Sequence, residues 1–276
     1  MKFSPYELYD LINRPGPLWL ANADLSDSNL RRVVLRGVIL SGANLSKVIL
    51  TNADLSDADL SEANLSESIL TEINLAKAAL VKADLSGANL SGANLSGASL
   101  GGAKLSHANM SEVNLRGANL RGAKLVRVNM SKANLQDVNF GGADLSDARL
   151  LEANMQGVKC IKAILSGATL ADSILIEADL SRAILMGTNL SRCNLGGADL
   201  SEANLSNANL NDADLGGARL TNTDLRNSSF FTANLRRVNL SGAHLQNVNL
   251  DKARYDTFTV WPDGFNPQAA GAIMVA

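Results

Sequence analysis

Few residues in this chain of 276 could carry out chemistry, and their spacing favours no reaction. The two histidines, His107 and His244, lack Cys, Asp or Glu at metal-ligand spacing on both sides. We therefore predict exposed histidine side chains and no metal site. The two cysteines, Cys160 and Cys193, stand at positions that are otherwise apolar, which predicts buried thiols of the kind found in a reducing cytoplasm.

A glycine-rich segment and a group of carboxylates also lack the partners that chemistry would need. Gly97–Lys104 (GASLGGAK) superficially resembles a phosphate-binding loop, but its lysine comes one place late and no Ser or Thr follows it. Its glycines recur every five residues, which indicates corner positions. Carboxylates cluster between Asp54 and Glu62, but no pocket is expected to desolvate them, and the many serines have no paired base. We predict no catalytic residue, no cofactor, no small-molecule substrate and no enzymatic activity.

These side chains must all be positioned by a five-residue repeat. Its most regular stretch, Ala83–Leu105, has the sequence ADLSG ANLSG ANLSG ASLGG AKL. The fifth-position residue, here named the centre, recurs without a slip from Leu20 to Leu250, which gives 47 apolar centres. All are leucine except the following: Met110, Met130, Phe140, Met155, Cys160 and Phe230. The residue two before the centre is almost always small, and the residue just before it is usually Asn or Asp.

Period five excludes both a long helix and a flat strand. Five residues advance an α-helix by about 500°, so successive centres would drift around its surface. In a flat strand an odd period places consecutive centres on opposite faces. A short extended piece followed by a bend satisfies the pattern, and bends in one direction close the chain into coils with stacked inward leucines. We therefore predict an all-β solenoid whose coils lie about 4.8 Å apart.

The stretch ADLSGANLSGANL resembles the A(D/N)LXX consensus of the pentapeptide-repeat family, and the resemblance covers about five-sixths of the chain. It implies a right-handed quadrilateral β-helix with four pentapeptides, or twenty residues, per coil. Sorting the centres by position modulo twenty supports this spacing. In the class from Leu25 to Leu245 every centre is leucine, and the residue two before it is alanine in eleven of twelve cases. The 47 centres then predict about twelve coils.

The repeat divides the chain into three predicted segments. Residues 19–253 are expected to form the β-helix as one domain, without insertion or proline. Residues 1–18 contain the capping box SPYE at Ser4–Glu7, which predicts a short N-terminal helical cap. Residues 254–276 are expected to form a C-terminal aromatic cap over the last coil, built from Tyr255, Phe258, Trp261 and Phe265. This ending resembles that of many cyanobacterial family members, which suggests a cyanobacterial origin.

One surface feature of the repeat is basic. Lys104 and Lys124 are one coil apart on the side that carries Leu25, and with Arg127 they form a candidate basic patch. The alternative is an ordinary solvated surface. The net charge of −2 and the balanced charges of the four sides give no electrostatic footprint for nucleic acid, so we expect no direct nucleic-acid binding.

A second surface feature is apolar. Ile164 and Ile184, twenty residues apart, replace the usual Asn or Asp on that same side. Met186 lies beside them and Ile161 lies near the preceding corner, so the four form a candidate protein-binding patch. The alternative is that β-branched residues stand there because they favour extended chain.

Together these features predict a non-enzymatic scaffold or protein-interaction module, with a regulatory role as one option. The alternative that the resemblance permits is a DNA-mimicking inhibitor or protector of a type II topoisomerase such as gyrase. Topoisomerase-binding members carry loops that interrupt the coils, and this chain has none. We expect an unidentified protein partner and a monomer or an end-to-end dimer. Without a long apolar run or a signal peptide, a cytoplasmic protein with no membrane contact is expected.

Overall fold

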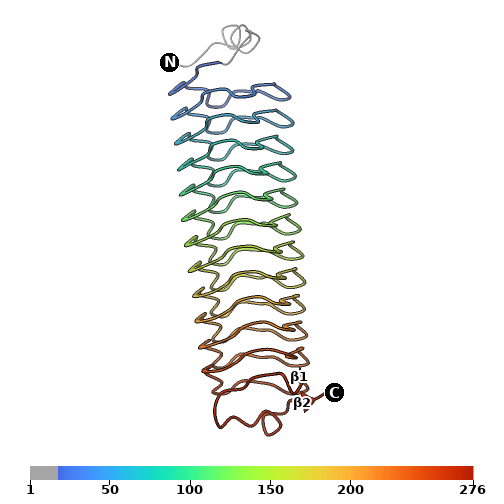
Figure 1. The fold of residues 1–276 in the computed structure, drawn as a ribbon. Coiled ribbons are helices and arrows are strands. Elements are labelled where there is room, and N and C mark those ends of the chain that lie inside the picture. The colour runs from blue at the N-terminus through green and yellow to red at the C-terminus, as the bar shows by residue number, and fades with distance from the viewer. Residues whose placement is uncertain (1–17, 276) are drawn as a thin grey trace. The chain divides into compact units, whose positions relative to one another are not determined.

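A computed structural model describes residues 18–275 of the chain. The chain divides after Asn134 into two compact units, and each unit is a β-helix built by the same rule (Figure 1). No helix occurs among residues 18–275. The helical cap predicted around Ser4–Glu7 lies outside the described residues.

One side of a turn is a three-residue extended segment that pairs with the next turn through its middle residue. In the second unit Ile164 and Ile184 form such a parallel bridge. Ile184 donates its N–H to the carbonyl of Ala163 at 2.9 Å, and its own carbonyl accepts the N–H of Leu165 at 2.7 Å. All bridges of the first unit, and those of the second as far as Arg254, join residues twenty apart. The predicted twenty-residue coil is therefore confirmed within each unit.

The sides meet at two-residue corners whose second residue has left-handed backbone. Gly97 and Gly102 occupy this position with φ of +67° and +65°, so the glycine-rich segment forms corners, as predicted. Other residues adopt the same conformation, including Arg182 and Glu202 with φ of 59° and 58°. The corner hydrogen bonds between turns hold these residues in a conformation that is uncommon for side chains other than glycine.

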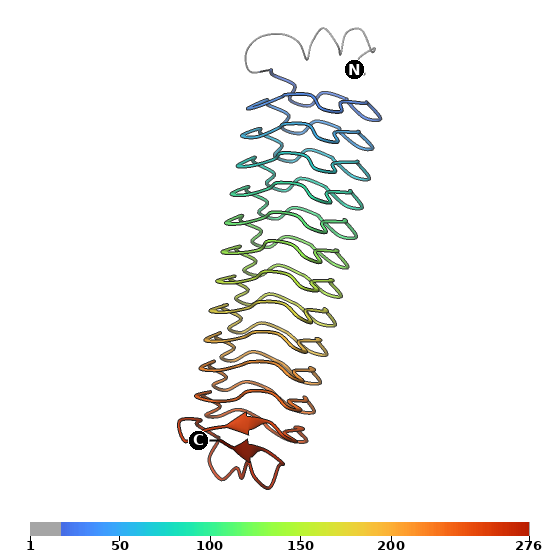
Figure 2. The same cartoon turned by 90° about the vertical axis from the view of Figure 1, so that its right-hand side faces the viewer.

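The centres form the core of each unit. Leu100 and Leu120 in the first unit, like Leu165 and Leu185 in the second, expose 0% of their surface. The non-leucine centre Cys160 is buried as well. Because bridged turns are stacked in register (Figure 2), centres twenty residues apart lie on neighbouring turns and form the predicted inward ladder.

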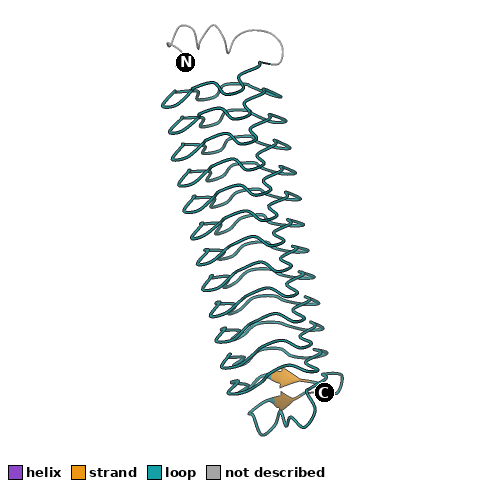
Figure 3. Cartoon of the chain, turned by 90° about the vertical axis from the view of Figure 1, so that its left-hand side faces the viewer, coloured by secondary structure: helices purple, strands orange, loops and turns teal. Residues whose placement is uncertain are grey.

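The C-terminal end of the second unit contains both strands of the described chain (Figure 3). β1 spans Arg254–Tyr255 and β2 spans Ile273–Met274, and the two pair in parallel. β1 still follows the twenty-residue register, because Arg254 pairs with Asn234. β2 therefore adds one further paired segment to the side formed by Asn234 and Arg254. Elsewhere each side contributes a single bridging residue, which Figure 3 draws as loop.

One residue is added to the repeat at the corner after β1. Asn239 pairs with Val260, twenty-one residues away instead of twenty. The Oδ1 of Asp256 accepts the N–H of Arg237 at 3.0 Å and the N–H of Phe258 at 3.1 Å. A side-chain carboxylate thus replaces the backbone carbonyl that receives the corner N–H in preceding turns.

Three of the four C-terminal aromatic residues form a cluster. Trp261 packs edge-to-face against Tyr255 with ring centroids 5.5 Å apart and stacks on Phe265 at 5.3 Å. The aromatic cap over the last coil stays a prediction. Phe258 lies apart from this cluster and is 69% exposed, because it stands on the corner that contains the added residue.

Candidate functional site

The candidate apolar patch lies on one side of the second unit. Because Ile164 and Ile184 are bridged in parallel, their side chains lie on neighbouring turns of that side. Ile184 is 39% exposed, Met186 47% and Ile161 39%, while Ile164 is half-buried. Ile161 and Met186 belong to the two corners that bound the side. These four residues are named the Ile184 surface.

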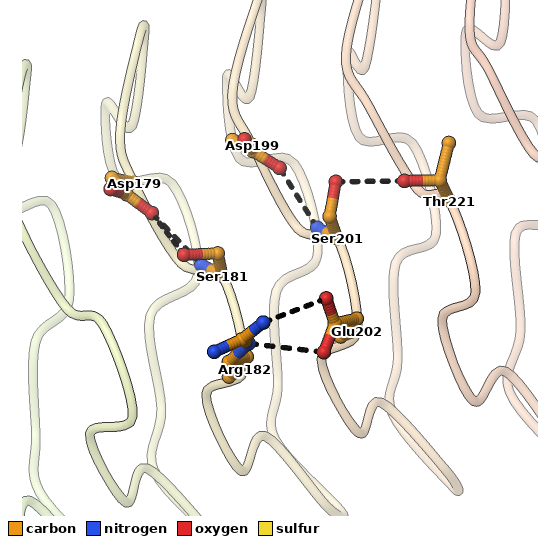
Figure 4. A network of polar contacts seen from close by, with 7 residues as sticks. All are labelled: Asp179, Ser181, Arg182, Asp199, Ser201, Glu202 and Thr221. Carbon is orange, nitrogen blue, oxygen red and sulfur yellow. Dashed lines mark hydrogen bonds and ion pairs between the residues drawn. The ribbon is translucent and has the colours of Figure 1, made fainter.

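Isoleucine on this side removes a hydrogen bond that stabilises the corner. On most sides the Asn or Asp side chain accepts the N–H of the residue two places on, as Asp179 does from Ser181 at 3.1 Å (Figure 4). Ile184 has no oxygen to offer the N–H of Met186. A hydrogen bond of this kind contributes about 0.5–1.5 kcal/mol. Corner stability alone would therefore favour Asn or Asp over isoleucine at this position.

An ion pair joins Arg182 and Glu202 on successive corners (Figure 4), and Arg182 lies two residues before Ile184 in the chain. Arg182 donates from Nε and Nη2 to the two carboxylate oxygens of Glu202 at 3.0 and 3.1 Å. Nearby, Thr221 donates its hydroxyl to Ser201 at 2.9 Å, and Asp199 accepts the N–H of Ser201 at 2.9 Å. Since these polar groups bind one another, they form a locally compensated border for the apolar residues.

The structure also brings together two residues of the predicted basic patch. Lys104 and Lys124 are bridged in the first unit, and Arg127 lies at the corner that follows Lys124. Lys104 forms an ion pair with Asp84 at 3.2 Å. This pair compensates part of the positive charge, so the patch is weaker than the lysine spacing alone indicates.

The residues first considered for chemistry do not gather into a reaction centre in the described chain. Cys160 and Cys193 are buried, and burial raises the pKa of each thiol to about 12. Neither forms the thiolate needed of a nucleophile at neutral pH. His107 and His244 are exposed, and within residues 18–275 no three His, Cys, Asp or Glu side chains are grouped so that they could hold a metal ion. In the same range no helix has the length and hydrophobicity to cross a bilayer.

Sequence reasoning missed the polar side chains that point inward. Thr188 and Thr223 occupy the small position two before a centre, and each donates its hydroxyl to a leucine carbonyl at 2.9 Å, from Thr188 to Leu165 and from Thr223 to Leu200. The signal was a hydroxyl residue where alanine is usual. Sequence reasoning also missed ion pairs between corners twenty residues apart, such as Arg192 with Asp172. Opposite charges at that spacing were the available signal.

Comparison with known proteins identifies the repeat. The family model described as pentapeptide repeats matches in eight copies, over residues 20–57, 58–97, 93–131, 133–170, 153–192, 163–201, 188–227 and 233–254. No curated protein matches the chain.

Three solved structures are similar to the chain. HetL, a pentapeptide repeat protein involved in heterocyst differentiation regulation from the cyanobacterium Nostoc sp. strain PCC 7120, is 32% identical over 85% of this chain and 92% of its own, with a TM-score of 0.36. The pentapeptide repeat protein alr5209 from Nostoc PCC 7120 is 37% identical over 35% of this chain and 84% of its own, with a TM-score of 0.27. QnrB1, a plasmid-mediated fluoroquinolone resistance protein, is 18% identical over 71% of this chain and 91% of its own, with a TM-score of 0.29. With its repeats matched by the family model, the chain belongs to the pentapeptide repeat family, whose fold is a right-handed β-helix.

Proposed function

We propose that this protein is a non-enzymatic protein-interaction module, with a scaffolding or regulatory role, and that the Ile184 surface contacts its partner. The observation that carries the proposal is the bridged pair Ile164–Ile184, extended at both corners by exposed apolar residues. Grouped apolar side chains on an otherwise polar surface mark interaction sites. A cyanobacterial source is part of the proposal, suggested by the cyanobacterial origin of HetL and alr5209.

The size of the surface suits a localised contact. Fully burying one large apolar side chain contributes about 1.5–3 kcal/mol before the entropy cost of association. Ile184 and Met186 are already partly covered, so each has only part of this free energy left to gain. The surface therefore serves as the apolar centre of an interface, and the polar border that includes Arg182 and Glu202 provides its rim.

The alternative of a DNA-mimicking topoisomerase inhibitor or protector is not favoured. Among the described residues of each unit, the twenty-residue register contains no inserted loop before Arg254. Several acidic corner residues are paired with basic ones on neighbouring turns, as Glu202 is with Arg182 and Asp172 with Arg192, which does not favour the acidic surface of a DNA mimic. In a gyrase supercoiling assay we expect neither inhibition nor protection, and either effect would support the alternative.

A cytoplasmic location is also proposed. Cys160 and Cys193 are both free and buried, which is compatible with a reducing compartment. Fractionation of the native cells with an antibody to this protein tests the proposal. Recovery with the cytoplasmic fraction is expected, and recovery with membranes or secreted protein would contradict it.

The function is tested by affinity capture from native cells with wild-type protein and the variant I164N/I184N/M186S, followed by direct binding of each purified candidate partner. The control variant I49N/I69N changes a second bridged isoleucine pair of similar exposure. We expect a partner that binds wild type and control and loses affinity for the triple variant. A partner that binds all three proteins equally would contradict the assignment of the surface.

A further inference from the structure

A second surface, separate from the Ile184 surface, lies at the C-terminal end of the second unit. A cavity of about 520 Å³ opens beside three successive corners that contain Gly216–Gly217, Arg236–Arg237 and Phe258. These five residues are named the arginine groove. The volume falls within the range of ligand sites, about 300–1,000 Å³, although this groove is open to solvent.

Two local features of the sequence create the groove. Gly216 and Gly217 carry no side chains, and a Cβ placed on Gly217 would meet no atom within 4 Å. At the opposite end, the added residue in the corner of Asp256 leaves Phe258 69% exposed. The corner of Arg236 and Arg237 therefore lies between a corner without side chains, at Gly216 and Gly217, and a corner shifted by the added residue, at Phe258.

The two arginines of the groove form no ion pair with a carboxylate of the described residues. Arg236 donates Nε to the side-chain oxygen of Asn234 at 3.1 Å, and the Arg237 guanidinium lies 5.6 Å from the centre of the Phe258 ring. Four other arginines form ion pairs with carboxylates: Arg182, Arg192, Arg219 and Arg226.

The carboxylates nearest the groove are already bound by neutral donors. Asp214 Oδ1 accepts the N–H of Gly216 at 3.0 Å and the side-chain amide of Asn234 at 2.7 Å. Asp256 Oδ1 accepts the backbone N–H of Arg237 and the hydroxyl of Thr259, both at 3.0 Å. These oxygens hold the backbone in place and form no ion pair with Arg236 or Arg237, although the charges of Asp256 and Arg237 still attract each other at longer range.

We propose that the arginine groove binds an acidic segment of a protein, in which a Glu or Asp carboxylate contacts Arg236 and Arg237 and a neighbouring apolar side chain packs on Phe258. Guanidinium groups bind carboxylates through paired, charge-assisted hydrogen bonds. The exposed ring adds an apolar contact beside the charge. The position of the groove is independent of the Ile184 surface, so either site can fail without the other.

An acidic protein segment fits the groove better than nucleic acid. Nucleic-acid binding draws its affinity from many phosphate contacts along a basic surface. Among the lining residues of the groove, two arginines stand together. One or two acidic side chains need only these two groups, whereas a phosphate chain needs a longer basic surface.

The experiment measures the binding of dye-labelled synthetic peptides to the full-length protein by fluorescence anisotropy. The probe has the sequence GEEFEEG, and the matched probes GKKFKKG and GEESEEG remove the negative charge and the aromatic ring. We expect wild type to bind GEEFEEG, to bind GEESEEG more weakly and not to bind GKKFKKG. The variant R236Q/R237Q should weaken the binding of GEEFEEG by about ten-fold or more.

The control variant R219Q/R226Q removes the same positive charge from arginines that already have carboxylate partners. It should bind GEEFEEG as wild type does. Equal binding by R236Q/R237Q and wild type would overturn the proposal, and so would an equal loss in the control, because attraction would then be non-specific. Absence of binding by wild type up to about 1 mM peptide, a standard binding free energy near −4 kcal/mol, would also overturn it. F258S should reduce the preference for GEEFEEG over GEESEEG, which a purely electrostatic contact would leave unchanged.

Discussion

Two bridged isoleucine pairs occupy equivalent positions of the repeat in the two units, yet they present different surfaces. Ile49 and Ile69 pair in the first unit as Ile164 and Ile184 do in the second. The more exposed member of each pair is almost equally open, at 40% for Ile69 and 39% for Ile184. The backbone environment and the exposure are therefore matched, and the difference lies in the adjoining corners.

The corners beside the first pair are polar on both sides. Lys47 and Glu67 form an ion pair at 3.6 Å, and the hydroxyl of Thr71 donates to that of Thr51 at 3.1 Å. In the second unit Ile161 and Met186 extend the apolar residues to both corners. An isoleucine pair alone is thus accounted for by its preference for extended chain. It forms a candidate interface only where the corners are apolar as well.

The largest expected effect is on the free energy of unfolding, and it distinguishes the outward residue Ile184 from the adjacent inward centre Leu185. Leu185→Asp places a carboxylate where no surface is exposed, and we expect it to lower the free energy of unfolding by about 4 kcal/mol or more. Its neighbour Ile184→Asn should leave stability within about 1 kcal/mol of wild type. Urea denaturation followed by circular dichroism measures both. Comparable losses in the two variants would mean that Ile184 belongs to the core.

The next effect concerns partner binding and directly tests the comparison between the two pairs. I164N/I184N/M186S should weaken binding of a partner at the Ile184 surface by about 10- to 100-fold, because three apolar contacts are lost. I49N/I69N should leave that affinity unchanged. Isothermal titration calorimetry with the purified partner measures both. A comparable loss in I49N/I69N would show that apolar corners are not what makes the second surface selective.

The repeat period allowed the fold to be predicted, since apolar centres every five residues leave few arrangements open. Centres such as Leu165 bury their side chains, and Gly97 forms a corner, for reasons that are local to each repeat. The bridging of Ile164 with Ile184 follows from the twenty-residue coil that the family resemblance implies. The candidate apolar surface was therefore predictable as a spatial group.

The C-terminal corner was not predictable in the same way. Nothing in the local sequence marks the added residue, because its position is defined only by the pairing of Asn239 with Val260. The sequence alone groups Phe258 with the other C-terminal aromatic residues, whereas it lies exposed beside Arg237. The ion pair between Lys104 and Asp84 could have been predicted, because the two residues are twenty apart and opposite in charge, but the sequence analysis overlooked it.

A smaller effect is expected on the stability of the partner-binding variants. I164N/I184N supplies two side-chain oxygens to the N–H groups of Ser166 and Met186, as Asn and Asp do at other corners. Each such bond contributes about 0.5–1.5 kcal/mol, offset by the lower strand preference of asparagine. We expect the melting temperature to stay equal to that of wild type or to rise by a few degrees. A clear fall would indicate that the isoleucines stabilise the second unit and are not reserved for a partner.

The smallest effect concerns the corner ion pairs, which border the isoleucine pairs and recur elsewhere in both units. Hydrogen bonding and charge from Arg192 lower the pKa of Asp172 below its ordinary value. A lowered native pKa means that the unfolded chain binds the proton more readily, so this contribution is present above the unfolded value of about 3.9 and disappears as the pH falls through the native one. D172N should therefore have a slightly lower melting temperature than wild type at pH 7, and the difference should shrink progressively as the pH falls below the unfolded value. Because both partners are exposed, the difference should also shrink in about 1 M salt. A difference that persisted unchanged at low pH would mean that D172N disturbs the corner backbone. The polar corners would then stabilise the turns through their backbone conformation and not through the charge of the ion pair.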